Sequence, residues 1–370
     1  MSIKPFKTYA EQASLLISRG LGSEEIRDEM EQRLKTVGYY RLSAYSYPFR
    51  ITEEKDGRMR KLDQFRPGTT FGRVWEYYLF DRRLRLLIID AIERVEVALR
   101  VQIAYEWSLM AKIPNPQSML NFFATKCREL PHEGRLRKFR EECTLFSMDS
   151  MPFIEKGLKE CLAYYASASE DLLFTLGKTM VKIQEAYDRS DEDFARHHKE
   201  DLEVARVEEL PVWVFIQFST FGNLHKLFVK GLPKSLKKRI AQNFGVQDVA
   251  FFSKALALLL AARNASAHHA RMWNKKWVYE TTDSRNPGVK CFVPICGATT
   301  DPGWSTPLSQ FSRSRTAYLL SLLCLLLEKT ASTSGWKERV KHLLTTHAPV
   351  PSIVQEMGFP ATWRQHPLWN

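Results

Sequence analysis

The sequence lacks the patterns that mark metal, redox and secreted proteins. Its six cysteines are scattered, none forms a Cys-x2-Cys pair, and the pair at 291 and 296 has no second pair downstream. Zinc sites of the common structural kind need two such pairs of ligands. We therefore expect no metal, no other cofactor, and reduced thiols in a cytoplasmic protein. The first residues hold no apolar signal core, which argues against secretion.

Long apolar runs and strand patterns are also scarce. The longest apolar run, residues 317–327, is interrupted by Ser321 and is shorter than the roughly 20 residues that span a bilayer. It predicts a buried helix, so we expect no association with a membrane. The sequence shows no repeated β–α unit and no glycine-rich phosphate loop. A short strand or one arm of a hairpin is expected only at residues 289–295.

The chain has an excess of positive charge. It carries 54 Lys and Arg against 42 Asp and Glu, a net charge of +12. This balance suits a polyanionic partner, but it does not distinguish RNA from DNA or an acidic protein, and a solvated basic surface without a partner also fits. The 44% content of hydrophobic residues excludes wholesale disorder.

Apolar side chains recur at helical spacing along most of the chain. Thr8 begins a capping box before a first helix, and Thr70 is the expected N-cap of a long helix ending near Trp107. The buried stripe of the long helix is expected at Leu84, Ile88, Ile92, Val95 and Leu99. We predict a mostly α fold, a helical bundle with additional N-terminal and middle helices and at most a short β-hairpin.

Charge runs and proline breaks suggest how the chain is divided. Residues 1–69 form an N-terminal region that is rich in aromatic and basic side chains. Residues 70–110 and 206–345 form the bundle, and residues 111–205 form a helical insertion within it. Residues 346–370 form a C-terminal tail that packs on the body.

The long helix also carries charged side chains outside its apolar stripe. Asp90–Arg94 and Glu96–Arg100 are spaced as i, i+4 ion pairs on its exposed side. The run at 81–85, Asp-Arg-Arg-Leu-Arg, is a candidate RNA contact, although such a run is more often a solvated helix face.

Residues 248–268 predict an apolar helix that ends in a cluster of polar groups and lies beside the long helix. Phe252, Leu256 and Leu259 form its buried stripe, and Arg263 is the next member of that stripe. An arginine there either extends to solvent or is held at a buried edge to meet an anion. Histidine transfers protons near neutral pH and arginine donates to phosphate oxygens, so the cluster suits acid–base chemistry on a phosphate. A helix end rich in Arg and His also complements the helix dipole without any function.

The spacing of these groups sets a geometric condition on the site. At about 100° per residue, Asn264, His268 and Arg271 share one face of a continuing helix. Arg263 and His268 are instead roughly 140° apart on an ideal helix. They reach one phosphate only if the helix is distorted near Ser266 or if two copies of the chain share the site.

Several motifs, in order along the chain, resemble one known family. The stretch at 263–274, Arg-Asn-Ala-Ser-Ala-His-His-Ala-Arg-Met-Trp-Asn, is similar to the signature of the bacterial Abi-like (abortive infection, AbiD/AbiF-type) family. That family belongs to the HEPN superfamily (higher-eukaryote-and-prokaryote nucleotide-binding). Further blocks that resemble the family lie at 9–20, 37–43, 71–84, 210–222 and 357–363.

The resemblance implies a HEPN-like helical core and metal-independent RNA cleavage in phage defence. It transfers Arg263 and His268 as catalytic residues and Asn264 as the polar residue after the arginine. His269 and Arg271 belong to the Abi-like extension of the signature and are auxiliary candidates.

The chain departs from the family's pattern at one position. Gln217 stands where a carboxylate is expected, which removes an auxiliary acidic role from that position.

Cleavage of RNA by its own 2′-hydroxyl needs two proton transfers and stabilisation of a phosphorane. We assign charge stabilisation to Arg263 and one proton transfer to His268. The second proton carrier is either His269 or the same histidine of a second copy, which favours a homodimer. The alternative is a non-catalytic RNA-binding or regulatory protein controlled by a small noncoding RNA.

Other basic and aromatic side chains are candidates for RNA binding. Aromatic rings interleaved with arginine stack bases and grip phosphates, although around residues 38–50 a loop whose tyrosines cover the core fits better. Residues 233–239 are a candidate phosphate-contacting loop. A second Arg/His cluster at 196–198 lacks the signature spacing and is left out of the site. The candidates are Tyr39, Tyr40, Arg41, Arg82, Arg83, Lys237, Lys238 and Arg239.

Overall fold

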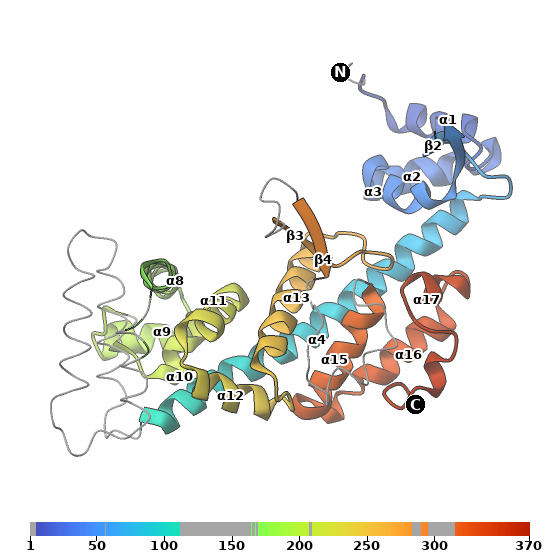
Figure 1. The fold of residues 1–370 in the computed structure, drawn as a ribbon. Coiled ribbons are helices and arrows are strands. Elements are labelled where there is room, and N and C mark those ends of the chain that lie inside the picture. Colours follow the sequence, from blue (N-terminus) through green and yellow to red (C-terminus); the bar gives the residue numbers. More distant parts are fainter. Residues whose placement is uncertain are drawn as a thin grey trace, which may run out of the picture.

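The computed structural model describes residues 5–55, 57–111, 164, 167, 169–206, 209–282, 290–294 and 315–370. In these ranges the chain is mostly helical, with two antiparallel two-stranded hairpins (Figure 1). The expectation of a mostly α fold is therefore confirmed.

A single long helix, α4 (Phe71–Ala111), is the axis of the molecule (Figure 1). Thr70 begins it as predicted, because its hydroxyl accepts the Arg73 N–H at 3.2 Å. The five stripe positions from Leu84 to Leu99 are all buried, as expected from their helical spacing. Helices α12 (Lys234–Asn243), α13 (Val249–Ala267), α15 (Thr316–Thr330) and α16 (Trp336–Thr346) pack against α4.

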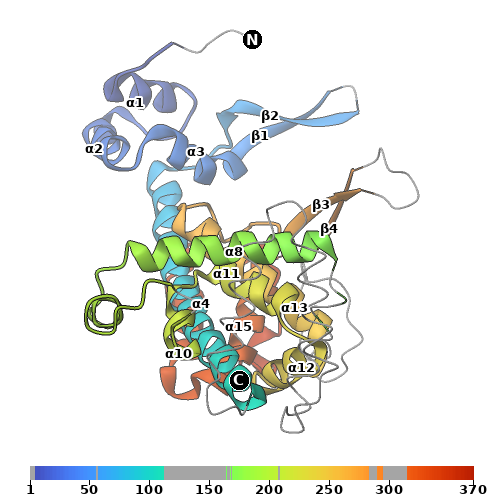
Figure 2. The ribbon, with the colours of Figure 1, turned by 90° about the vertical axis from the view of Figure 1, so that its left-hand side faces the viewer.

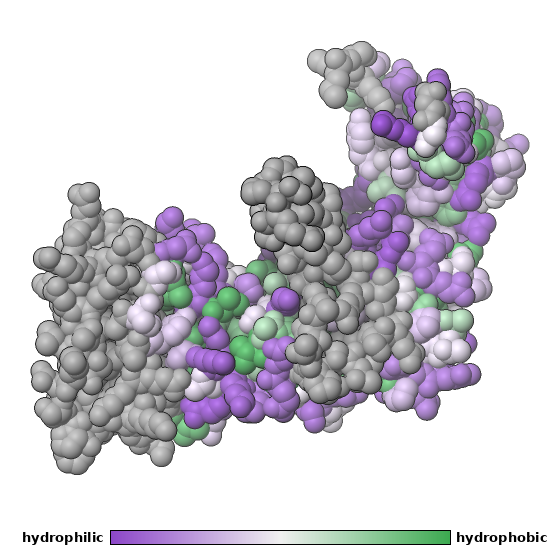
Figure 3. Space-filling view, viewed as in Figure 1, coloured by the Kyte–Doolittle hydropathy of each residue, from purple (hydrophilic) through white to green (hydrophobic). Residues whose placement is uncertain are grey.

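The N-terminal region lies at the N-terminal end of α4, where α3 packs on α4 (Figure 2). The predicted capping box is present, since Thr8 accepts from the Glu11 N–H and Glu11 accepts from the Thr8 N–H. Residues 39–46 form a helix rather than a loop. Hydrophilic side chains predominate on the visible face of this region (Figure 3). Its elements are α1 (Tyr9–Ser18), α2 (Arg27–Val37), α3 (Tyr39–Ser46), β1 (Arg50–Lys55) and β2 (Arg58–Phe65).

The expectation of at most one short hairpin was wrong, because β1 and β2 form a second one. They pair Glu53 with Arg60 and Lys55 with Arg58, and most of their side chains are exposed. Strands that are polar on both faces show no apolar alternation in sequence. The available sequence signal was the Asp-Gly dipeptide at 56–57, and Gly57 has φ +70°. The arm expected at 289–295 corresponds to β4 (Lys290–Pro294), which pairs with β3 (Val278–Thr282).

The remaining helices follow α4 in the sequence. After Pro211 the helical segment is interrupted at Ser219, and Trp213 is 56% exposed. Residues 233–239 belong mainly to a helix and not to a loop. The helices are α8 (Glu170–Asp188), α9 (Asp193–Arg196), α10 (Val212–Phe215), α11 (Phe221–Lys226), α12 (Lys234–Asn243), α13 (Val249–Ala267), α15 (Thr316–Thr330), α16 (Trp336–Thr346) and α17 (Ser352–Glu356).

Two tryptophans attach the C-terminal helices and the final residues to the body. Trp336 is buried and its indole N–H donates to the Leu87 carbonyl of α4 at 2.7 Å. Trp369 is also buried and donates to the Ser321 hydroxyl of α15 at 3.0 Å. A buried indole usually finds a partner for its N–H in this way.

One helix of the described residues, α13, is long and apolar enough to cross a membrane by length and composition. A helix in the core of a protein has the same composition. Here α13 packs against α4, α11 and α12, which accounts for its apolar surface.

Candidate functional site

The polar end of α13 emerges from a buried helix. Phe252, Leu256 and Leu259 are fully buried, as their spacing predicted. Arg263 and Asn264 are exposed one turn later. Their side chains contact each other, with an Arg263 guanidinium N–H donating to Oδ1 of the Asn264 side chain at 3.4 Å. Arg263 therefore extends to solvent at the edge of the core.

Helix α13 is regular through Ser266 and ends at Ala267. The His268 N–H still bonds to the Asn264 carbonyl at 2.9 Å, and the chain then reverses at His269, where φ is +57°. The His269 N–H donates to Ser266, and the Ala270 N–H donates to Ala265. These bonds make a Schellman cap in which His269 occupies the left-handed position that usually holds glycine. We call residues 268–270 the cap; both of its imidazoles are exposed.

Because the helix ends here, Arg271 does not share a face with Asn264 and His268, and that expectation was wrong. Arg271 is half-buried and donates to the Ala44 carbonyl of α3. Its guanidinium lies 5.8 Å from the Trp273 ring centre. Burial lowers the pKa of Arg271. Arg271 thus joins the segment after the cap to α3.

A buried carboxylate on α4 holds the backbone that follows the cap. Oδ1 of Asp81 accepts the backbone N–H groups of Met272 at 2.8 Å and Trp273 at 2.7 Å. Oδ2 accepts the Tyr45 hydroxyl of α3 at 2.8 Å and the Arg85 guanidinium at 2.5 Å. Burial raises the pKa of Asp81, and these four donors oppose the shift by favouring the charged form.

The run at 81–85 is therefore not one solvated face. Asp81 and Arg85 are buried, and only Arg82 and Arg83 are exposed in the expected way. The sequence held a signal for this: Asp81 and Arg85 precede Ile88 by seven and three residues, which places both on the apolar stripe of α4.

The tertiary structure brings Arg41 of α3 to the cap. Its guanidinium donates to the His269 carbonyl oxygen at 3.4 Å, and the side chain remains exposed. The neighbouring Tyr40 is 80% exposed. These two candidates for RNA binding thus lie on the helix that adjoins the candidate catalytic residues.

A comparison with protein families matches more than half of the chain. The model of a family described as Abi-like protein matches residues 32–274. The chain belongs to the Abi-like family. Neither the curated proteins nor the solved structures that were searched include a match to this chain. The matched range contains α3, α4 and the cap, and it also contains the four hydrogen-bond partners of Asp81.

Among the other RNA-binding candidates of this Abi-like protein, some side chains are exposed and others are bonded to neighbouring residues. Tyr39 is half-buried and accepts a hydrogen bond from Arg19 at 3.0 Å. Lys237 donates to the Val229 carbonyl, and burial lowers its pKa. Arg239 forms an ion pair with Glu106 at 3.1 Å, whereas Lys238 is exposed. Of the α12 candidates, Lys238 is the most accessible.

Glu96 of α4 lies near the site, although its sequence context gave no sign of this. Its side chain is 18% exposed and pairs with Arg100 at 3.0 Å, as the i, i+4 spacing predicted. Burial raises the pKa of Glu96, and the positive charges of Arg100 and Arg263 oppose this rise. The carboxyl group of Glu96 on α4 therefore interacts electrostatically with the charge of Arg263. Gln217 is exposed and donates to the Trp213 carbonyl at 3.0 Å.

The second Arg/His cluster of this Abi-like protein, at residues 196–198, forms ion pairs with nearby residues. Arg196 pairs with Asp193 and His197 pairs with Asp201. Among the described residues, no group of three or more His, Cys, Asp or Glu side chains could hold a metal ion.

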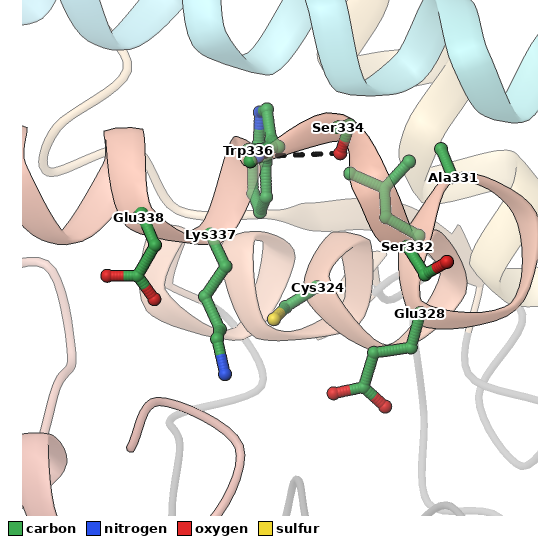
Figure 4. Close-up of a pocket in the computed structure, with 10 residues that line it drawn as sticks. Cys324, Glu328, Ala331, Ser332, Ser334, Trp336, Lys337 and Glu338 are labelled. Atoms are coloured by element: carbon green, nitrogen blue, oxygen red, sulfur yellow. Dashed lines mark hydrogen bonds between the residues drawn. The ribbon is translucent and has the colours of Figure 1, made fainter.

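A pocket of about 320 Å³ lies between α15 and α16 (Figure 4). The thiol of Cys324 lies in it, and burial raises the pKa of this group to about 12. A thiol with that pKa stays protonated and is a poor nucleophile. Lys337 at the rim donates to the Asn370 carbonyl at 2.9 Å.

The strained position at the cap makes a testable prediction. We expect His269→Gly to raise the free energy of unfolding by up to about 1 kcal/mol, because glycine adopts a positive φ without a Cβ clash. His268→Gly is the matched control, since residue 268 has φ −84°. It is expected to lower the free energy of unfolding by about 0.5–1 kcal/mol. Urea unfolding measures both, and a loss of stability in His269→Gly would contradict the prediction.

Proposed function

We propose that this Abi-like protein is a metal-independent endoribonuclease of the HEPN type that acts in abortive infection. Membership of the family suggests a function of the abortive-infection type. The observation that supports RNA cleavage is the joint exposure of Arg263, Asn264, His268 and His269 at the end of a buried helix. A guanidinium and imidazoles held on a rigid support suit phosphate binding and proton transfer.

In the proposed reaction, His268 takes the proton of a 2′-hydroxyl or gives one to the departing 5′-oxygen. Arg263 stabilises the negative charge of the phosphorane, because a guanidinium offers positive charge and several hydrogen-bond donors. Asn264 orients His268 or the phosphate, and its side chain also contacts Arg263. The products carry 2′,3′-cyclic phosphate and 5′-hydroxyl ends.

A site shared by two copies of the chain is part of this proposal. Since α13 is regular through Ser266, no distortion there turns Arg263 toward His268 of the same chain. On an ideal helix, positions 263 and 268 lie roughly 140° apart. A homodimer in which the ends of α13 face each other would pair the arginine of one copy with the histidine of the other. In a monomer, the second proton carrier would be His269.

The substrate in this proposal is cytoplasmic RNA, bound in part by α3. Arg41 lies beside the cap and remains accessible, so it can bind a phosphate next to the scissile one. Tyr40 offers an exposed ring on which an unpaired base can stack. The net charge of +12 favours association with a polyanion.

The test is incubation of the full chain with total RNA, with and without EDTA, followed by mapping of the RNA ends. We expect cleavage that EDTA does not inhibit and ends of the kind stated above. Inhibition by EDTA, or 3′-hydroxyl products, would contradict the mechanism. Tight RNA binding without any cleavage would instead support the non-catalytic alternative, a regulatory protein that a noncoding RNA controls.

A further inference from the structure

We infer that α3 is a positioning element of the site and that Tyr45 and Asp81 act as positioning residues for the cap. The inference rests on the proposed function and adds the N-terminal region to the catalytic unit. It comes from contacts between segments that lie more than 180 residues apart in the sequence.

One face of α3 contacts the cap and the residues after it. Arg41, Ala44 and Tyr45 are spaced as i, i+3 and i+4, so they lie on the same side of the helix. Arg41 donates to the His269 carbonyl, and the Ala44 carbonyl accepts from Arg271. Tyr45 donates to Asp81, which in turn binds the backbone after the cap. A shift of α3 would therefore disturb three contacts together.

The two oxygens of the Asp81 carboxylate bind different parts of the chain. Among the residues that the structure describes, its Oδ1 accepts only from the chain after the cap, at Met272 and Trp273. Its Oδ2 accepts from Tyr45 of α3 and from Arg85. Asp81 is fully buried, so water does not replace a lost partner. Each oxygen thus has two donors, which sets the orientation of the carboxylate and of the amides it holds.

The opposite edge of the same backbone is also held. The Thr316 hydroxyl of α15 donates to the Met272 carbonyl at 2.6 Å, and the Trp277 indole reaches the same hydroxyl at 3.4 Å. Residue 272 is therefore fixed through both its N–H and its carbonyl. The imidazoles at 268 and 269 are displayed between a regular helix and this fixed segment.

Apolar packing would suffice to hold two segments together, and burial of an ion pair contributes little net stability. Hydrogen bonds are directional, however, and a displacement of about 1 Å at a reacting group can cost 10²-fold in rate. The arrangement is therefore better suited to fixing the orientation of the cap than to adding stability.

The test compares Tyr45→Phe with Tyr78→Phe. Tyr45→Phe removes only the hydroxyl on Asp81 and keeps the ring in the core. Tyr78 packs edge-on against the Tyr45 ring at 5.6 Å, and its hydroxyl has no hydrogen bond among the described residues, so it is the matched control. For each variant, kcat and KM of RNA cleavage, the exchange of the amide hydrogens at Met272 and Trp273, and the melting temperature are measured.

For Tyr45→Phe we expect faster exchange at both amides and kcat lowered about tenfold or more, with KM within twofold of the parent. Tyr78→Phe is expected to match the parent in all of these. A variant that only loosened the fold would lower the melting temperature without changing kcat at a temperature where it stays folded.

Three outcomes would count against the inference. Unchanged exchange in Tyr45→Phe would overturn it whatever the activity. Faster exchange with unchanged kcat would show that the contact is structural only. If the parent cleaves no RNA, the proposed function fails and the catalytic role of α3 fails with it, while the exchange data still decide whether Tyr45 holds the backbone after the cap.

Discussion

Replacing His268 with alanine is expected to lower the rate of RNA cleavage by about 10²–10⁴-fold, the usual contribution of a group that transfers a proton in the transition state. Because the imidazole is exposed and the cap bonds run through the backbone, the variant should fold like the parent. RNA binding should change little, since the arginines proposed to contact phosphate, Arg41 and Arg263, are unchanged. Single-turnover cleavage of one labelled RNA measures the rate, and a filter-binding assay measures affinity.

His197→Ala is the matched control for this substitution. His197 is an exposed histidine beside an arginine at another helix end, and it contacts Asp201. Loss of such an exposed pair is worth about 0–1 kcal/mol of stability and should leave cleavage unchanged. If His268→Ala cleaves as fast as the parent, or if His197→Ala loses as much, the assignment is wrong.

The same assay examines the second proton carrier. In a monomeric site, His269→Gly should lose cleavage although it gains stability, which separates catalysis from folding. In a site shared by two copies, mixing Arg263→Ala with His268→Ala chains should restore part of the activity, since one of the two composite sites is then intact. Restoration without dimers in solution would contradict the shared site.

Replacing Asp81 with asparagine is expected to lower the free energy of unfolding by about 3–5 kcal/mol, the cost of breaking a buried ion pair on one side. The asparagine amide would face donors that the carboxylate now satisfies, and the charge of Arg85 would stay buried without its partner. Denaturant unfolding followed by tryptophan fluorescence measures the change.

Asp90→Asn is a strict control because Asp90 lies on the same helix and also contacts two arginines. It pairs with Arg94 at 3.0 Å and Arg339 at 2.7 Å, but it is 30% exposed. Water can solvate the two arginines once the charge of Asp90 is removed. The expected loss of unfolding free energy is therefore below about 1 kcal/mol. Equal losses in the two variants would mean that burial of Asp81 carries no special cost.

The helices of this protein follow from local patterns. The apolar stripe from Leu84 to Leu99, the N-cap at Thr70 and the buried stripe of α13 are all present where spacing predicted them. Local signals suffice here because the period of 3.6 residues decides which side chains a helix buries. The polar end of α13 was visible for the same reason, since Arg263 follows directly on a buried stripe.

Local patterns failed where the chain leaves a helix or buries a charge. Arg271 seemed to share a face with His268 because the helical angle was extended past Ala267, whereas a left-handed residue at 269 turns the chain. The β1–β2 hairpin was missed because its side chains are polar on both faces.

Short-range periodicity, which depends on neighbours three and four residues away, thus determined which segments are helices and where the polar cluster lies. It did not determine which distant residues contact the cluster. Arg41 and Asp81 are joined to residues 269–273 by hydrogen bonds that span more than 180 positions. A charged side chain is stable in the core only when it is paired and hydrogen-bonded. Asp81 receives two of its four donors from Met272 and Trp273, so its burial depends on how distant segments pack.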